Sequence, residues 1–193
     1  MQATISTKYF DLYRNFFSDE EAKTIFEKLM EELKFERHNL KIRGKVIPEP
    51  RLNTFHTDAE PEYGYSGAQQ ENKKITPTLN QLLKVMRVHF DEKFDSVLCN
   101  LYQNGKEYIG WHADREARET VVASLSLGAT RKFRMRKIKE TRGWDYEWDL
   151  KAGDLIIMKV GCQNKYKHTV PKQLRVTEPR LNLTFRAMAC YKK

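Results

Sequence analysis

Two histidines and an aspartate in this chain have the residue types and spacing of a metal-binding group. His112 and Asp114 stand two positions apart, so on an extended segment their side chains project to the same side, and His168 follows much further along. Two imidazoles and one carboxylate occupy one face of an octahedral iron(II) and leave the opposite face open. The trio therefore predicts an iron site. A solvated loop histidine is the alternative, because His-x-Asp also occurs by chance.

Residues 180–186 alternate polar and apolar side chains, as a half-buried strand does. The apolar face must pack on a core, so the polar face either meets solvent or lines a pocket. In a pocket, the two arginines would favour a small dianion, because a guanidinium grips a carboxylate through two hydrogen bonds. The polar face consists of Arg180, Asn182, Thr184 and Arg186. Residues 96–102 also read as a strand, with Asn100 and Tyr102 on one side.

Four motifs in this order resemble a known family: Asn100-x-Tyr102, His112-x-Asp114-x-Glu116, His168, and residues 180–186. They are similar to those of the AlkB-type iron(II)- and 2-oxoglutarate-dependent nucleic-acid dealkylases, most closely the eukaryotic repair members, over about residues 41–191. The resemblance implies a double-stranded β-helix, or jelly roll. It also implies oxidative demethylation of 1-methyladenine and 3-methylcytosine in DNA or RNA, with O2 as oxidant and with release of formaldehyde, succinate and CO2.

The same resemblance assigns the co-substrate site. It implies that His112, Asp114 and His168 bind iron(II), and that 2-oxoglutarate chelates the metal through its ketoacid end. Its far carboxylate is then held by Arg180 with help from Tyr102 and Thr184, while Arg186 reaches toward the iron end beside Asn100. The full expected 2-oxoglutarate set is Asn100, Tyr102, Arg180, Asn182, Thr184 and Arg186.

For the nucleic-acid substrate the resemblance implies a flipped base stacked between Tyr65 and His112. Glu116 would favour a cationic methylated base over its neutral parent; the alternative is a solvent-exposed partner of Arg115 or Arg118. A duplex-acting relative has an aromatic wedge where this chain has Arg43, and an acidic residue where it has Arg115, so the preference between duplex and single strand stays open. The expected substrate contacts are Arg43, Gly44, Lys45, Arg51, Tyr63, Tyr65, Ser66, Arg115 and Glu116.

The composition fits an intracellular protein with a polyanionic partner. The chain has 193 residues, and its formal net charge of +9 favours a polyanionic partner. Its three cysteines are scattered along the sequence, which argues against a disulfide framework or a zinc site. No apolar run is long enough to span a membrane, and no secretion signal begins the chain. We expect a monomer that is not secreted, located in the nucleus if the source is eukaryotic.

The elements that position these residues are readable from periodicity. Ser18 and Glu21 form a capping box before a helix with an apolar stripe, and Thr76-Pro77 opens a second helix. The stripes are Ala22, Ile25, Phe26, Leu29, Met30 and Leu33, and Leu79, Leu82, Leu83, Met86 and Phe90. Between the helices, residues 41–70 are rich in glycine and tyrosine and predict short hairpins that mix cations with aromatic rings, as in a nucleotide-recognition lid.

From Ser96 onward the chain predicts short strands without helices, hence an antiparallel barrel or sandwich. Residues 121–127 and 130–136 predict a hairpin across Gly128-Ala129. The expected fold is mostly β with flanking helices (α+β): a jelly-roll core buttressed by two N-terminal helices. We expect one domain over residues 1–193, with buttress and lid at about 1–95 and catalytic core at about 96–191.

Cations also alternate along the strand at 131–136. Lys132, Arg134 and Arg136 share one face and could follow a phosphate backbone, although a solvated sheet face explains them equally well. Three alternative functions remain: demethylation of RNA marks, oxygenation of protein side chains by a 2-oxoglutarate enzyme, and a non-enzymatic basic nucleic-acid-binding module.

Overall fold

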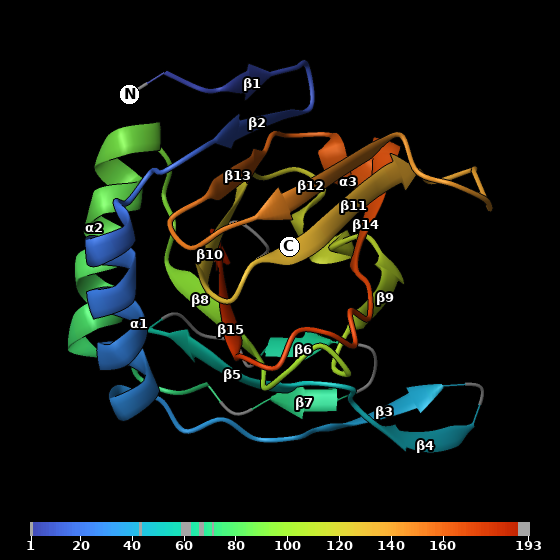
Figure 1. The fold of residues 1–193 in the computed structure, drawn as a ribbon, viewed down its shortest axis with the longest axis horizontal. Helices are drawn as coiled ribbons and strands as arrows, with labels where there is room; N and C mark the ends of the chain where they lie inside the picture. Colours follow the sequence, from blue (N-terminus) through green and yellow to red (C-terminus); the bar gives the residue numbers. More distant parts are fainter. Residues whose placement is uncertain (1, 43, 59–62, 66–67, 71, 189–193) are drawn as a thin grey trace.

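Two antiparallel β-sheets form the core of the computed structural model, which describes residues 2–42, 44–58, 63–65, 68–70 and 72–188 (Figure 1). The larger sheet has seven strands in the order β1-β2-β13-β10-β15-β8-β5, and the smaller has four in the order β12-β11-β14-β9. The larger comprises β1 (Ile5–Ser6), β2 (Phe10–Tyr13), β5 (Leu52–Thr57), β8 (Ser96–Tyr102), β10 (Val122–Gly128), β13 (Leu155–Met158) and β15 (Arg180–Arg186). The smaller comprises β9 (Ile109–His112), β11 (Arg131–Lys137), β12 (Tyr146–Leu150) and β14 (Tyr166–Val170).

Two helices cover the outer face of the larger sheet and lie side by side in Figure 1. They are α1 (Asp19–Glu32), which begins with the expected capping box of Ser18 and Glu21, and α2 (Pro77–Phe90). Their apolar residues pack with those of β8, β10 and β15 in one buried cluster, so the expected buttress is confirmed. One stripe residue was assigned wrongly: Met30 is 37% exposed, because it lies at the border of the packed face.

A second buried cluster fills the space between the two sheets. The larger sheet contributes residues such as Leu12, Val122 and Ile156, and the smaller contributes Phe133 and Met135. Strand β15 divides its side chains between the two cores: Leu181, Leu183 and Phe185 join the cluster under the helices. Its polar side chains therefore face the interior between the sheets, which is one of the two alternatives that the sequence left open.

The expected hairpin of residues 121–127 and 130–136 is wrong. Strand β10 pairs with β13 and β15 in the larger sheet, whereas β11 pairs with β12 and β14 in the smaller. The chain crosses between sheets at Gly128, whose φ of +75° suits glycine. A Cβ there would lie 2.5 Å from the carbonyl oxygen of Pro179, so the corner is tightly packed. Crossing at a corner between packed sheets is how a jelly roll is wound.

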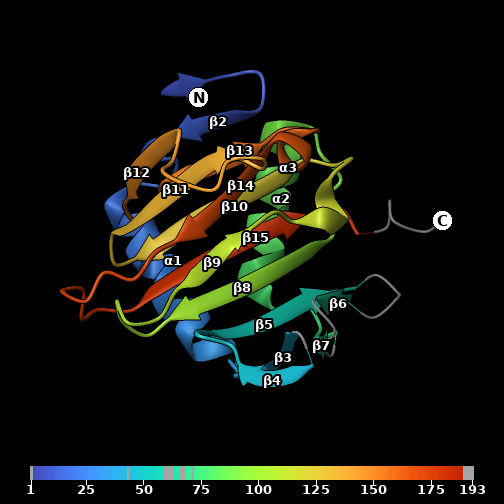
Figure 2. The same ribbon diagram turned by 90° about the vertical axis from the view of Figure 1, so that its right-hand side faces the viewer.

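Two small hairpins lie near the β5 edge, far from the β1–β2 end (Figures 1 and 2). They are β3 (Asn39–Ile42) with β4 (Lys45–Pro48), and β6 (Tyr63–Tyr65) with β7 (Ala68–Gln70). Gly44 has a φ of +79° at the first bend, as expected for a glycine turn. The short hairpins predicted for this stretch are confirmed. None of the described helices has the length and apolar character needed to cross a membrane.

Candidate metal and co-substrate site

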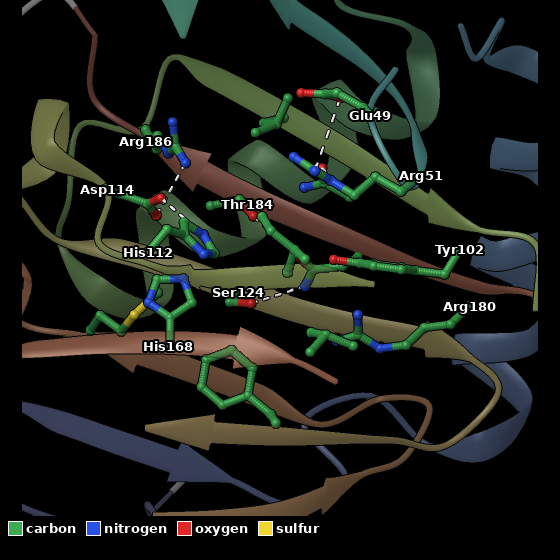
Figure 3. Close-up of a pocket in the computed structure, with 17 residues that line it drawn as sticks. Glu49, Arg51, Tyr102, His112, Asp114, Ser124, His168, Arg180, Thr184 and Arg186 are labelled. Atoms are coloured by element: carbon green, nitrogen blue, oxygen red, sulfur yellow. Dashed lines mark hydrogen bonds and ion pairs between the residues drawn. The ribbon is translucent and has the colours of Figure 1, made fainter. Parts of the chain in front are cut away.

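His112, Asp114 and His168 converge in a pocket between the two sheets (Figure 3). One ligand atom of each lies within 4.8 Å of the other two. Strand pairing explains part of this, because His112 at the end of β9 is directly opposite His168 on β14. Asp114 lies two residues after the end of the strand, directly before a short 3-10 helix, Arg115–Ala117, and its Oδ1 is 3.6 Å from Nε2 of His112.

The hydrogen bonds of the triad fit a bound cation. Nδ1 of His112 lies 2.8 Å from the carbonyl oxygen of Gly110, and a carbonyl only accepts, so Nδ1 carries the proton. The unprotonated Nε2 then lies 3.6 Å from Oδ1 of Asp114. Both atoms are electron donors, so a metal ion between them would stabilise this arrangement. Nδ1 of His168 is buried and has no hydrogen-bond partner in the part of the chain that the structure describes. Two imidazole nitrogens and a carboxylate are donors that iron(II) accepts.

The protonation states also suit metal binding. Burial lowers the pKa of His112 and lowers that of His168 to about 3, so both imidazoles are neutral at neutral pH. Burial alone would raise the pKa of Asp114, but Arg186 and the two histidines lower it below its usual range. The carboxylate is therefore ionised. Metal ligands must be deprotonated, and all three are.

Three further side chains fix the triad in place. Nη2 of Arg186 lies 3.1 Å from Oδ2 of Asp114. The backbone N–H of Asp114 donates to Oε1 of Gln163 at 3.0 Å, from α3 (Cys162–Lys165). The ring of Phe133 stacks on His168 at a centroid distance of 5.3 Å. Such supporting contacts orient ligands before a metal arrives.

The other end of the pocket is built for an anion. Arg180 is 1% exposed, and one of its terminal nitrogens, Nη2, donates to Oγ of Ser126 at 2.9 Å. Its Nε and Nη1 are buried and have no hydrogen-bond partner among the described residues. Burial lowers the pKa of Arg180 to about 10, so the side chain still carries its charge at neutral pH. A buried cation with unpaired N–H groups fits a carboxylate, which supplies the acceptors and the opposite charge.

Polar side chains of β15 and β10 connect the two ends. Figure 3 shows Thr184 and Ser124 between the triad on one side and Arg180 with Tyr102 on the other. Asn182 donates to Oγ of Ser124 at 2.9 Å, and Thr184 donates to Asn182 at 3.2 Å. All the residues expected to bind 2-oxoglutarate line this one pocket. The arrangement can hold a short diacid between a metal and an arginine.

Asn100 and Glu116 have partners that differ from expectation. Asn100 is directly opposite Asn182 across the strands, whereas Arg186 is opposite Ser96, and Asn100 accepts a hydrogen bond of 2.6 Å from Nε of Arg51. Glu116 accepts from Nη1 of Arg186 at 2.6 Å, a partner that the sequence did not suggest. Arg186 thus reaches the metal end, as expected, and joins Asp114 to Glu116.

The expected substrate contacts are described only in part. Arg43 and Ser66 lie outside the described residues, as do the side chains of Tyr63, Tyr65 and Arg115. Lys45 is exposed on β4, and Gly44 forms the preceding bend. Arg51 is buried and lines the pocket beside Glu49, 4.0 Å away. These contacts with a base stay predictions.

The cations of β11 have more carboxylate and aromatic partners than the sequence suggested. Lys132 and Arg134 both pair with Glu147, at 3.0 and 2.5 Å, and Lys132 also pairs with Asp149. The guanidinium of Arg134 lies 3.8 Å from the ring centre of Trp144, and that of Arg136 lies 4.1 Å from that of Trp111. A phosphate would have to compete with these carboxylates, which favours the solvated sheet face over a phosphate track.

The sequence interpretation missed several residues of this pocket. Ser124 and Ser126 alternate with apolar residues on β10, and that signal was readable. Glu49 precedes β5 without any periodic pattern, so only the fold reveals that it is buried here. Among the described residues, the triad is the one group of histidine, cysteine, aspartate or glutamate side chains placed to share a metal. Cys99 and Cys162 are buried free thiols, and Cys190 lies outside the described residues.

Comparison with known proteins adds independent support. The model of the 2OG-Fe(II) oxygenase superfamily matches residues 10–186. Human alpha-ketoglutarate-dependent dioxygenase alkB homolog 3 is 36% identical over 189 residues, covering 92% of this chain and 65% of the relative. Human DNA oxidative demethylase ALKBH2 is 31% identical over 194 residues, covering 94% of this chain and 74% of the relative. The chain thus spans about 65% of the alkB homolog 3 sequence.

A solved structure, described as that of OsALKBH1, has the same fold. It superposes with a TM-score of 0.63 at 18% identity, covering 95% of this chain and 100% of that structure. The matched family is defined by iron(II) and 2-oxoglutarate, and the pocket has residues that fit both. The two histidines and the aspartate at one end can bind the metal, and the buried arginine at the other end can bind a carboxylate. With the family match over residues 10–186, this places the chain in the 2OG-Fe(II) oxygenase superfamily, among its AlkB-type members.

Proposed function

We propose that this protein is a dioxygenase that removes N-methyl groups from 1-methyladenine and 3-methylcytosine in DNA or RNA. The observation that carries the proposal is the pocket itself, in which a metal triad and a buried arginine face each other across the strands β15 and β10. The formal net charge of +9 supports a polyanionic substrate. The names of the two relatives, a dioxygenase and a DNA oxidative demethylase, point the same way.

The protein contributes binding and orientation to this reaction. Bound iron(II), 2-oxoglutarate and O2 supply the oxidising chemistry, which inserts oxygen into the N-methyl group so that formaldehyde leaves. His112, Asp114 and His168 would hold the metal, and Arg180 with Ser126 would hold the far carboxylate of 2-oxoglutarate. Asp114 and His168 are 3% and 6% exposed, so the sheets shield these two side chains from bulk water.

The base would enter from the side of the pocket that carries Glu49 and Arg51. These residues follow β4 directly, so the first hairpin of the proposed lid leads straight into the pocket wall. Glu49 is 2% exposed, and its carboxylate already has Arg51 at 4.0 Å and a hydrogen bond from Asn53, so a positively charged methylated base would share it with these two residues. Glu116 would contribute less than the sequence suggested, because Arg186 already engages its carboxylate.

The test is aerobic incubation with iron(II), 2-oxoglutarate and oligonucleotides that contain 1-methyladenine or 3-methylcytosine. We expect formaldehyde release and restored bases, with no reaction by the His112→Ala variant. Single- and double-stranded DNA and RNA form one panel, which also decides the preferred nucleic acid. Absence of base restoration on every member of the panel contradicts the proposal. Succinate formation stimulated by a protein substrate instead would favour the side-chain oxygenase.

A further inference from the structure

Arg131 is a buried arginine that lies outside the lining of the pocket. It is the first residue of β11 and shares the inward face of that strand with Phe133 and Met135, whereas the neighbouring cations face outward. Its exposure is 1%. A long cationic side chain in such a position needs both hydrogen-bond acceptors and an electrostatic reason to stay charged.

Four acceptors surround its guanidinium group. Nη2 donates to the carbonyl oxygens of Glu107 and Pro171, both at 2.8 Å, and Nη1 donates to that of Asn104 at 3.1 Å. Nε donates to Oε1 of Gln173 at 3.3 Å. All four acceptors are neutral. Among the described residues no carboxylate lies within ion-pair distance of Arg131, and that of Glu107 is engaged by Arg37 at 2.5 Å.

The acceptors belong to two loops that Arg131 ties together. The backbone N–H of Gly105 donates to the carbonyl of Val176, and that of Gln173 donates to the carbonyl of Gly105, each at 2.8 Å. A Cβ on Gly105 would lie 1.8 Å from the carbonyl oxygen of Gln173, so the loops touch backbone to backbone. This closure lies behind the Arg180 end of the pocket, next to Tyr102.

Tyr102 lies between Arg131 and the pocket. The guanidinium carbon of Arg131 is 5.5 Å from the ring centre of Tyr102, and that of Arg180 is 5.4 Å from it. Tyr102 lines the pocket and is 2% exposed, whereas Arg131 does not line it. Two buried cations therefore share one aromatic ring, and the charge of Arg131 helps to lower the pKa of Arg180. An anion at Arg180 would relieve this repulsion.

We propose that Arg131 is a positioning residue of the co-substrate site, which holds Tyr102 beside Arg180 and adds a second positive charge behind the distal carboxylate of 2-oxoglutarate. The inference rests on the proposed function only for the identity of the co-substrate. Its consequence is selectivity for a keto diacid over a keto monoacid. Attraction of a dianion depends on both cations, while chelation of the metal by the ketoacid end does not.

The test compares 2-oxoglutarate with 2-oxopentanoate, which has the same chain length but a methyl group in place of the distal carboxylate. Binding to the Mn(II)-loaded protein is measured by calorimetry, so no turnover is needed. We expect Arg131→Met to weaken 2-oxoglutarate on the order of tenfold or more and to leave 2-oxopentanoate within about twofold. Arg87→Met is the matched control, because Arg87 also donates to a carbonyl, that of Phe94, but lies on α2.

Two results would overturn the proposal: unchanged 2-oxoglutarate binding by Arg131→Met, or equal weakening of both keto acids, which would indicate a structural role only. If circular dichroism shows that Arg131→Met is unfolded, Arg131→Lys decides, because lysine keeps the charge but cannot reach all four acceptors. A smaller loss, still restricted to 2-oxoglutarate, is then expected. Selective binding without any base demethylation would contradict the proposed function alone, and a wild-type protein that binds neither keto acid would contradict both.

Discussion

Nη2 of Arg186 lies 3.1 Å from Oδ2 of Asp114, so the last residue of β15 supports the carboxylate of the metal triad. Both side chains are almost fully buried, and the same guanidinium reaches Glu116 through Nη1. An ion pair of this kind keeps the carboxylate ionised and aimed at the metal. The wall of the pocket and the metal site are therefore one connected structure.

Arg186→Gln is expected to weaken metal binding. Without the guanidinium, Asp114 loses its orienting partner, and the loss of such support typically lowers metal affinity by about 10- to 100-fold. Titration of Mn(II) into the metal-free protein measures the change. Arg87→Gln serves as the control, and an Arg186→Gln variant with unchanged affinity would show that Asp114 does not depend on this contact.

Mn(II) is expected to stabilise the protein through the triad. At a metal concentration about 100-fold above the dissociation constant, the stabilisation is about 2.7 kcal/mol, or roughly 5 to 10 °C in Tm for a chain of this size. His112→Ala should abolish the shift, while His89→Ala on α2 should keep it. Thermal unfolding monitored by circular dichroism decides, and a full shift in the His112→Ala protein would place the metal elsewhere.

His56 is expected to titrate below the usual histidine range. Burial is the main cause of its lowered pKa, and its Nδ1 contacts the carbonyl oxygen of Lys74 at 2.7 Å. Because the pKa is lower in the folded state than the ordinary value of 6.5, the folded protein binds fewer protons than the unfolded chain, and this contribution to stability falls as pH drops below 6.5. NMR titration of the imidazole gives the pKa directly, and a value at or above 6.5 would refute the expectation.

Gly105→Ala is expected to destabilise the contact between the two loops that contain Gly105 and Gln173. The new Cβ would lie 1.8 Å from one backbone oxygen and 2.9 Å from another, so the loops must separate. We expect a loss of about 2 kcal/mol or more in the free energy of unfolding, at the upper part of the usual range for overpacking. Gly110→Ala is the control, since a Cβ there meets nothing within 4 Å. Urea unfolding of both variants measures the difference, which should be absent if the loops are not in contact.

The sequence predicted the site better than the path of the chain. Alternation along β15 predicted that Arg180 and Arg186 share a face, and the positions of His112, Asp114 and His168 predicted one metal group, because these are local or family patterns. The supposed hairpin across Gly128 failed because strand propensity does not reveal which sheet a strand joins. Only long-range pairing decides that.

Arg131 was missed for a related reason. It shares its strand with four other cations, and nothing local distinguishes the one that turns inward from those that face solvent. Alternation with Phe133 and Met135 was the available signal, but it acquires meaning only once the inward face is known. Glu49 had no periodic signal at all, since it lies in the short connection between β4 and β5.

Strand β15 is hydrogen-bonded on both sides, to β10 and to β8, and carries one arginine at each end of the pocket. Its register is therefore fixed. Inserting one residue would exchange its polar and apolar faces and disrupt both hydrophobic clusters. New substrate preferences in proteins of this kind should therefore arise in the hairpins at the sheet edge, where length can vary without disturbing the chemistry.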